Sequence, residues 1–290
     1  MEIPNIYFPH LGWSFNLDSQ AFSFFGLPVY WYGIILTSGI ILGTFIACYI
    51  GKKEKLDPNI FLDFVLYDIV FALLGARLYF VIFNWDYYKT NPSQILNIRQ
   101  GGLAIYGGVI VSIIVAVIYT HRKKVRFTHF ADVATYGLVL GQAIGRYGNF
   151  FNKEAFGGYT DNLFAMAILK SEAKPPISAE VLSHIKTFDA FGAAEYIQVH
   201  PTFFYESCWN FLLLIGLLIY RKHRKAYGEI FCIYLVGYGV GRFWIEALRT
   251  DQLLLWNTHI PVSQVVAIIS IIMGIIGIVF CRKKCKIKLK

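Results

Sequence analysis

The chain has 290 residues, of which 56% are hydrophobic, 17% aromatic and only 16% charged. An ordinary soluble domain of this length needs more polar side chains to cover its surface, so the composition excludes that class and indicates a membrane protein. The formal net charge of +9 suits either nucleic acid or an anionic membrane surface until the positions of the basic residues are considered.

We predict an all-α membrane domain that covers residues 1–290 and crosses the bilayer seven times. A helix needs about 18 or more apolar residues to cross about 30 Å of hydrocarbon. In chain order, the runs of that length are 29–50, 60–83, 103–120, 130–147, 203–220, 229–248 and 260–280. No internal repeat or low-complexity linker divides them.

The Lys and Arg residues predict which ends of these spans face the cytoplasm, because short cytoplasmic loops carry an excess of them. Alternate connecting segments hold 17 and 7 of the 27 basic residues, and three lie within spans. The richer segments are 51–59, 121–129, 221–228 and 281–290. The N-terminus is therefore expected outside and the C-terminus inside. Most of the positive charge then faces anionic lipid, and no nucleic-acid partner is expected.

Two longer segments are expected on the external side. Residues 1–28 are rich in aromatic side chains, which suit an arm lying along the membrane–water interface. They contain no Lys or Arg, so they lack the basic start of a cleavable signal peptide. Residues 152–202 carry charges and several prolines, and they are long enough to form a small external subdomain.

Glycines recur at intervals of four within the predicted spans, which favours close helix packing in lipid. They are Gly39 and Gly43, then Gly137, Gly141 and Gly145, then Gly237 and Gly241. The glycines of "GGLAIYGG" at 101–108 surround a tyrosine and start a helix poorly. We predict a loop there that re-enters the membrane and leaves its backbone accessible to a ligand.

Ionisable residues inside the spans each need a partner or a position near a boundary, because a charge at mid-membrane costs on the order of 2.5–3.5 kcal/mol. They are Asp63, Asp68, Arg77, Asp132, Arg146, Glu206, Arg242 and Glu246. Asp63 and Asp132 lie near predicted cytoplasmic ends, so we expect them to cap helices or to meet basic loops.

The sixth span carries a polar stripe. Tyr238, Arg242, Glu246 and Arg249 follow one another at spacings of four, four and three, which places them on one face of a helix. An internal Arg242–Glu246 pair that locks two helices together is one interpretation. The stripe holds two arginines for one glutamate, so we expect positive charge to remain unmatched.

A second polar face lies in the fourth span, where Gln142, Arg146 and Asn149 follow at spacings of four and three. Arginine forks, asparagine amides and backbone N–H groups are all suitable donors to phosphate. The two faces predict a site for a phosphate-bearing lipid headgroup in the outer half of the bilayer, with a channel or transporter as the alternative. The cysteines and histidines show no metal-ligand spacing, so no metal or other cofactor is expected.

The stretch "GRYGNFFNKEAFG" at 145–157 resembles the signature of the bacterial prolipoprotein diacylglyceryl transferases. That pattern is Gly-Arg-x-Gly-Asn-Phe-x-Asn-x-Glu-x-x-Gly, and the chain matches it at every fixed position. The similarity extends to "WYG" at 31–33, "GARLYFVIFN" at 75–84, "HPTFFYES" at 200–207 and "GYGVGRFWIEALRTD" at 237–251. Seven spans and an external N-terminus also agree with that family.

The resemblance implies an enzyme of the bacterial cytoplasmic membrane that works at the outer leaflet. It would transfer the diacylglyceryl group of phosphatidylglycerol to the lipobox cysteine thiol of a prolipoprotein signal peptide, forming a thioether and releasing glycerol phosphate. Arg146 and Arg242 would be the principal headgroup contacts. The other residues assigned by the motifs to the lipid and reaction cavities are Tyr32, Asn149, Asn152, Glu154, Gly157, Tyr238, Glu246 and Arg249.

The sequence departs from the family at one position, because Tyr106 stands where well-known members carry a histidine proposed as the base for the thiol. A tyrosine with a pKa near 10 is a weak base at neutral pH, although nearby arginines would lower its pKa. His200, next to Pro201, is the alternative base. Electrostatic activation of the thiol by the arginines, with no side-chain base, is the third possibility.

Two other classes of function use the same residues. A transporter or flippase would line a path for anionic lipid with the arginines. A sensor or scaffold would bind the lipid without turnover. A thioether product formed from phosphatidylglycerol and a cysteine-containing peptide distinguishes the enzyme from both.

Overall fold

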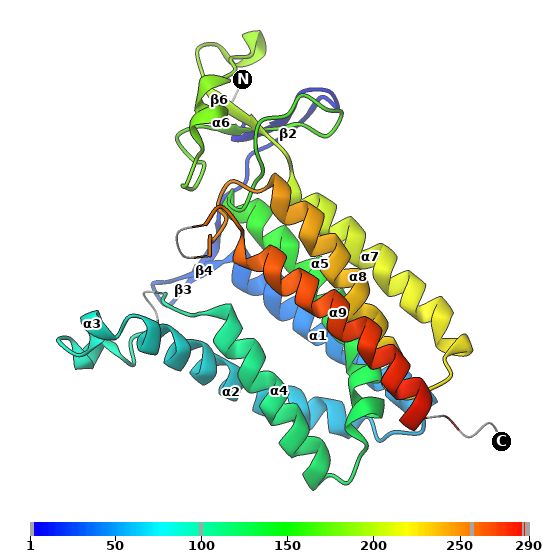
Figure 1. Cartoon of the computed structure of the whole chain (residues 1–290). Helices are drawn as coiled ribbons and strands as arrows, with labels where there is room; N and C mark the ends of the chain where they lie inside the picture. Colours follow the sequence, from blue (N-terminus) through cyan, green and yellow to red (C-terminus); the bar gives the residue numbers. More distant parts are fainter. Residues whose placement is uncertain (1–2, 99–100, 256–257, 286, 288–290) are drawn as a thin grey trace. The chain divides into compact units, whose positions relative to one another are not determined.

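A computed structural model describes residues 3–98, 101–255, 258–285 and 287, and most of them lie in helices (Figure 1). The long helices are α1 (Trp31–Lys53), α2 (Asn59–Phe83), α4 (Ile105–Arg122), α5 (Phe127–Asn152), α7 (Thr202–Tyr220), α8 (Glu229–Leu248) and α9 (Val262–Lys284). The chain divides into two compact units, one of Met1–Gly43 and Thr135–Lys290 and the other of Thr44–Ala134. Both α1 and α5 contribute to the two units.

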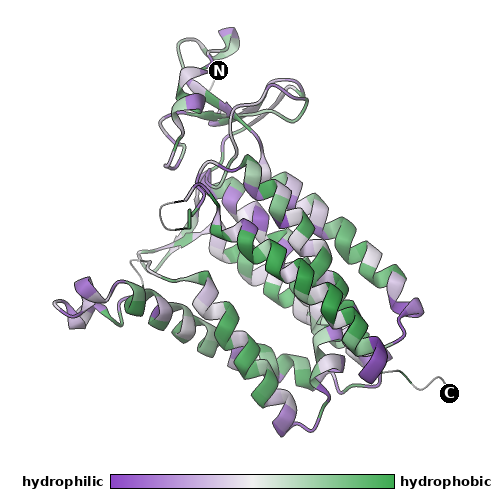
Figure 2. Ribbon diagram, in the orientation of Figure 1, coloured by the Kyte–Doolittle hydropathy of each residue, from purple (hydrophilic) through white to green (hydrophobic). Residues whose placement is uncertain are grey.

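Six helices in the described part of the chain are long and apolar enough to cross a membrane. They are α1, α2, α4, α8, α9, and α7 together with the short η3 (Arg221–His223). Green dominates their ribbons in Figure 2, and side chains such as Ile113, Ile219 and Ile276 are more than half exposed. Because exposed apolar surface on this scale needs a lipid environment, the helices confirm a multi-pass membrane protein.

The fourth predicted span coincides with α5, whose composition differs from that of the other six helices. With 26 residues at about 1.5 Å per residue, α5 is about 39 Å long and could reach across a bilayer. Its polar residues, such as Asp132, Gln142 and Arg146, lower its mean hydropathy and leave it outside the apolar set. Seven spans therefore stay a prediction.

The prediction of an all-α chain needs a correction, because the chain also forms two antiparallel sheets. The larger sheet has the strand order β2 (Trp13–Phe15), β1 (Ile6–Phe8), β5 (Met166–Leu169) and β6 (Tyr196–Val199). Ile6 pairs with Ile168, which pairs in turn with Ile197. The arm at 1–28 and the segment at 152–202, two separate features of the prediction, therefore share one sheet.

This sheet has an apolar core of its own. Ile6, Ile168 and Ile197 are fully buried, and they pack with Phe156 and Phe203 from the chain on either side of β5 and β6. Each such side chain contributes about 1.5–3 kcal/mol when it leaves water. The short α6 (Ala179–Ser183) and η2 (Asp189–Phe191) connect β5 to β6.

A second, two-stranded sheet precedes the first long helix. It consists of β3 (Gln20–Phe24) and β4 (Leu27–Tyr30), and α1 begins at the next residue, Trp31. Phe24, Leu27 and the turn residue Phe25 are all more than half exposed. The described part of the predicted arm therefore consists of short strands that lead directly into an apolar helix.

The glycines of α1 and α5 allow close contact between these helices. A Cβ added to Gly43 would lie 2.5 Å from the carbonyl oxygen of Gly137, and the reciprocal approach is closer still. One turn away, a Cβ on Gly39 would lie 3.2 Å from the carbonyl oxygen of Gly141. The prediction of glycine-mediated helix packing is confirmed for this pair of helices.

The unit Thr44–Ala134 is built on α2 and α4, with the short α3 (Trp85–Tyr88) and η1 (Pro92–Gln94) between them. Asp63 on α2 lies 2.9 Å from Nζ of Lys123, which confirms that this carboxylate meets a basic loop. The "GGLAIYGG" stretch is only half loop, because α4 begins at Ile105 and contains Tyr106.

Arg77 on α2 binds part of the backbone of that loop, and the accessibility of the rest of the loop to a ligand stays a prediction. The guanidinium donates to the carbonyl oxygens of Gly101 and Gly102 over 3.0 and 2.8 Å. It also donates to those of Gln94 and Ile95 over 2.7 and 2.8 Å. Arg77 is 7% exposed, so these four carbonyls provide the polar partners that a buried guanidinium requires.

The Gly43–Gly137 contact makes a testable prediction about stability. We expect Gly137→Ala to lower the free energy of unfolding by about 1–3 kcal/mol, because the added methyl overlaps the backbone of α1. The matched control is Gly216→Ala on α7, where a Cβ would meet nothing within 4 Å. Thermal unfolding of both variants in detergent measures the difference, and equal melting temperatures would contradict the packing argument.

Candidate functional site

Ionisable side chains meet near the C-terminal ends of α5 and α8 and the N-terminal end of α7. Glu206 on α7 is only 3% exposed and lies between two arginines. Its Oε1 lies 2.5 Å from Nη2 of Arg146 on α5, and its Oε2 lies 3.2 Å from Nη1 of Arg242 on α8. One buried carboxylate therefore joins three helices.

The ion pairs continue along α8 into the loop that follows it. Nη2 of Arg242 lies 2.6 Å from Oε2 of Glu246, which confirms the pair that the spacing suggested. The guanidinium of Arg249 binds both oxygens of Asp251, over 2.9 and 2.7 Å, and its Nε lies 3.9 Å from Oε2 of Glu246. We call Arg146, Glu206, Arg242, Glu246, Arg249 and Asp251 the arginine network.

The expectation of unmatched positive charge is wrong for the arginine network, which contains three guanidinium groups and three carboxylates. The polar stripe of α8 holds two arginines and one glutamate, as its sequence shows. The missing negative charges come from Glu206 on α7 and from Asp251 after α8, which balance Arg146 and Arg249. Charge balance lets the network stay buried, because each ion has a close partner of opposite sign.

Uncharged polar groups continue the site toward the middle of α5 and α8. The amide Nε2 of Gln142 lies 2.9 Å from the hydroxyl of Tyr234, and the ring of Tyr234 stacks on that of Tyr238 with centroids 5.6 Å apart. Tyr238 interacts electrostatically with Glu206 and Arg146. The predicted polar face of α5 therefore contacts α8 through Gln142 and α7 through Arg146.

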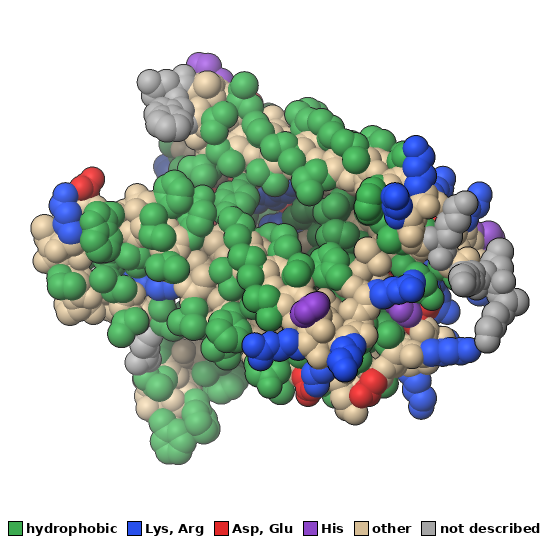
Figure 3. All heavy atoms as spheres, turned by 60° about the horizontal axis from the view of Figure 1, so that its bottom comes forward, with side chains coloured by type: hydrophobic (Ala, Val, Ile, Leu, Met, Phe, Trp, Pro, Cys, Tyr) green, Lys and Arg blue, Asp and Glu red, His purple; other side chains and the backbone are tan. Residues whose placement is uncertain are grey.

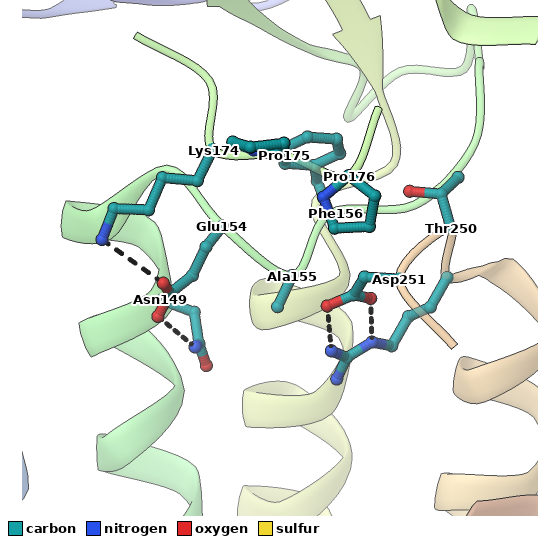
Figure 4. Close-up of a pocket in the computed structure, with 10 residues that line it drawn as sticks. Asn149, Glu154, Ala155, Phe156, Lys174, Pro175, Pro176, Thr250 and Asp251 are labelled. Atoms are coloured by element: carbon teal, nitrogen blue, oxygen red, sulfur yellow. Dashed lines mark hydrogen bonds and ion pairs between the residues drawn. The ribbon is translucent and has the colours of Figure 1, made fainter. Parts of the chain in front are cut away.

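A polar cavity of about 290 Å³ shares Arg249 and Asp251 with the arginine network (Figure 4). Asn149 and Asn152 donate to the same oxygen of Glu154, Oε1, over 3.1 and 3.0 Å. Nζ of Lys174 lies 3.4 Å from the other oxygen of Glu154, and both residues line the cavity. Hydrogen-bonding groups therefore surround a space large enough for a small polar ligand.

Gly157 and His200 lie where three chain segments cross. The backbone N–H of Gly157 donates to the carbonyl oxygen of His200 over 3.0 Å, and that of Gly158 donates to the carbonyl oxygen of Leu248 over 2.9 Å. A Cβ on Gly157 would lie 2.7 Å from the Cβ of His200 and 2.8 Å from the Leu248 oxygen. Close backbone packing thus explains the glycine at this position.

The His200 side chain is partly buried beside two polar groups. Its Nδ1 lies 3.3 Å from the hydroxyl of Tyr205 and 3.5 Å from Nδ2 of Asn162. Burial lowers the pKa of His200 below its ordinary value of about 6.5. The imidazole is therefore neutral at pH 7, which is the form that accepts a proton.

Most of the residues predicted for the site belong to the same compact unit. They are Tyr32, Arg146, Asn149, Asn152, Glu154, Gly157, His200, Tyr238, Arg242, Glu246 and Arg249. Tyr32 contacts α5, because its ring occupies the space where a Cβ on Gly148 would lie. Tyr106 belongs to the other unit, in the first turn of α4, so its proximity to the arginines stays a prediction.

Three residues that the structure brings to the site were not predicted from the sequence as site residues: Glu206, Asp251 and Lys174. The sequence did indicate a special role for Glu206, because it is a carboxylate within an otherwise apolar span. Asp251 and Lys174 lie in loops, where charged side chains are common and carry no periodic signal. Only the tertiary contacts assign these two residues to the site.

Comparison with known proteins gives a consistent result over nearly the whole chain. Residues 19–280 match the model of the family named prolipoprotein diacylglyceryl transferase. Curated proteins named phosphatidylglycerol–prolipoprotein diacylglyceryl transferase are similar over 269 residues, which is 92% of this chain and 93% of each relative. The identity is 43% for Bacillus cereus strain B4264, 42% for Bacillus cereus strain G9842 and 41% for Bacillus anthracis strain CDC 684 / NRRL 3495.

The shared carboxylate makes a second testable prediction. We expect Glu206→Gln to lower the free energy of unfolding by about 3–5 kcal/mol, because it leaves two buried guanidinium groups without their common partner. The control is Glu195→Gln, which removes a carboxylate from a half-exposed pair with Lys170 and should cost less than about 1 kcal/mol. Denaturant unfolding in detergent compares them, and similar losses would show that Glu206 has no special structural role.

Proposed function

The chain belongs to the prolipoprotein diacylglyceryl transferase family, and from this premise we propose that its arginine network binds the phosphate of phosphatidylglycerol. The chain is a transferase of lipoprotein biosynthesis that moves a diacylglyceryl group from phosphatidylglycerol to a prolipoprotein. The family match over residues 19–280 carries this conclusion, and it does not favour a lipid transporter or flippase.

The geometry of the arginines supports the phosphate site. A guanidinium has five N–H donors in a planar fork, and the ion pair of Arg146 to Glu206 uses Nη2. Glu206 and Glu246 hold Arg242 from two sides, so its plane is oriented before a ligand arrives. The arginines need little rearrangement to donate to a phosphate, which is the condition for strong electrostatic stabilisation.

The reaction that fits these groups is a displacement at a glyceryl carbon. The thiolate of the lipobox cysteine in the prolipoprotein signal peptide forms a bond to the carbon, and the bond from that carbon to the phosphate oxygen breaks. Glycerol phosphate leaves with the electron pair, and the product is a thioether. Arg146 and Arg242 stabilise the negative charge that grows on the leaving phosphate.

A proton must leave the thiol, whose ordinary pKa is about 8.5, before it reacts. His200 is the candidate base within the unit that holds the arginines, and burial keeps it neutral at pH 7. Tyr106 is the candidate suggested by its position in the glycine-rich stretch. In the third model the arginines lower the pKa of the thiol without any side-chain base.

The direction of the helices supports a site at the outer leaflet of the cytoplasmic membrane. The arginine network lies at one end of α5, α7 and α8, and the loop that joins α7 to α8 at the opposite end is rich in Lys and Arg. Figure 3 shows that much of the visible surface is hydrophobic and that Lys and Arg side chains occur on it in separate groups. If basic loops face the cytoplasm, the network faces outward, the N-terminus is external and α5 is the fourth of seven spans.

The phosphate site predicts that the shape of the cation matters as much as its charge. We expect Arg146→Lys to reduce transfer from phosphatidylglycerol by about 100-fold or more, because a point charge replaces a fork of donors. Transfer to a cysteine-containing lipobox peptide is measured with purified protein in mixed micelles. The exposed Arg122→Lys is the control and should keep full activity; near-normal transfer by Arg146→Lys would overturn the phosphate assignment.

The two candidate bases predict different effects of substitution on kcat. If the Tyr106 hydroxyl carries the proton, Tyr106→Phe loses about 100-fold or more in kcat, whereas His200→Gln retains most of it. If His200 is the base, the result is reversed. We expect a loss in one variant alone, measured as the dependence of kcat on pH for both; full activity in both would leave electrostatic activation by the arginines as the mechanism.

A further inference from the structure

The cavity beside the arginine network is lined by two separate ion pairs. Lys174 pairs with Glu154 on one side, and Arg249 pairs with Asp251 on the other (Figure 4). The hydroxyl oxygen of Thr250, which also lines the cavity, is buried and has no hydrogen-bond partner among the described residues. The cavity therefore offers charged groups that already compensate one another, together with a hydroxyl that lacks a partner.

The cavity adjoins the arginine network, because both Arg249 and Asp251 line it. Arg249 lines the cavity, and its Nε lies 3.9 Å from Oε2 of Glu246, which in turn pairs with Arg242. The cavity therefore lies next to the residues proposed to bind the phosphate, where the next few atoms of a headgroup would be. The volume of about 290 Å³ is at the small end of the range for ligand pockets, so it suits a group of a few heavy atoms.

Lys174 reaches the cavity because a buried lysine holds the backbone of its segment. Lys153, whose side chain is 7% exposed, lies 2.7 Å from Oε2 of Glu172 and donates to the carbonyl oxygen of Leu17 over 2.6 Å. The carbonyl oxygen of Lys153 accepts from the backbone N–H of Lys174 over 3.1 Å. Asn5 donates to the same Glu172 oxygen over 3.1 Å. The segment at 172–174 is thus fixed against the end of α5 and the N-terminal arm.

The charge of Lys174 changes which headgroup the cavity prefers. Without it, the carboxylate of Glu154 would keep the two asparagine donors but would lack a cation, and it would attract a ligand ammonium. With Lys174 in place, an ammonium meets a like charge beside each carboxylate. A neutral hydroxyl donates to a compensated carboxylate at no such cost, and it can also bond to Thr250.

We propose that this cavity holds the terminal glycerol of the phospholipid headgroup and that Lys174 is a specificity-determining residue, which disfavours lipids with a cationic headgroup. This inference rests on the proposed phosphate site, and it adds a means by which the site would favour a glycerol headgroup over an ethanolamine headgroup of similar size. Lys174 acts on the lipid through its charge, and Lys153 positions Lys174.

The test measures competition between two lipids in mixed micelles. Transfer from phosphatidylglycerol to a lipobox peptide is followed as phosphatidylethanolamine is added, and the concentration that halves the rate is recorded for each variant. We expect this concentration to fall about fivefold for Lys174→Met and further for Lys174→Glu, while Lys174→Arg resembles the unmodified protein. The value compares rates within one preparation, so a loss of folded protein does not change it.

The matched control is Lys170→Met, which removes the same charge from the same external segment. Lys170 pairs with Glu195 over 2.7 Å and does not line the cavity, so its half-inhibiting concentration should equal that of the unmodified protein. The Lys174 effect should also shrink at about 1 M salt, because half-exposed charges are screened. A merely structural role for Lys174 would not depend on salt in this way.

The outcomes separate this inference from the function on which it rests. If the unmodified protein forms thioether from phosphatidylglycerol but Lys174→Met and Lys174→Glu are inhibited by phosphatidylethanolamine no more strongly, the headgroup cavity is wrong and the transferase assignment stands. If the unmodified protein forms no thioether at all, the proposed function fails first. A shift in Lys170→Met as large as that in Lys174→Met would also overturn the inference, since it would show a general charge effect.

Discussion

The rest of the site depends on the ion pairs that the buried carboxylate of Glu206 forms with Arg146 and Arg242. A carboxylate in apolar surroundings needs opposite charges at close range, and these two arginines supply them from α5 and α8. The three helices must therefore stay close at this point. Close packing of the glycines at 39, 43, 137 and 141 then brings α1, with Tyr32 at its start, against the same helix that carries Arg146.

The charge balance of the arginine network bears on how a lipid phosphate would bind. Three guanidinium groups and three carboxylates leave no net charge to attract an anion over long distance. What the network offers instead is orientation, because the carboxylates hold the planes of the arginines in place before binding. In a site with little water, such fixed donors stabilise developing charge better than mobile ones, since no reorganisation is needed during the reaction.

The four-stranded sheet and the segments connected to it complete the polar cavity beside the helices. Strands β1 and β2 come from the first 15 residues, and β5 and β6 come from the segment between α5 and α7. Lys153 at the end of α5 links these parts through Leu17 and Glu172, and the same segment delivers Lys174 to Glu154. A subdomain that the composition marks only as charged and proline-rich therefore shapes one wall of the site.

The features that depend on local order along the chain could be predicted from the sequence alone. Apolar runs, glycines four residues apart and the stripe from Tyr238 to Arg249 are periodic signals, and a helix converts such signals directly into faces. The signature at 145–157 identified the family from contiguous residues. The strands escaped detection because they are only three to five residues long, too short for an alternating pattern to stand out. The three-dimensional structure was needed to show that Glu206 pairs with two arginines, that Asp251 balances Arg249 and that Lys174 faces Glu154. These pairs join separate segments, and which charge meets which depends on how the helices and the sheet pack.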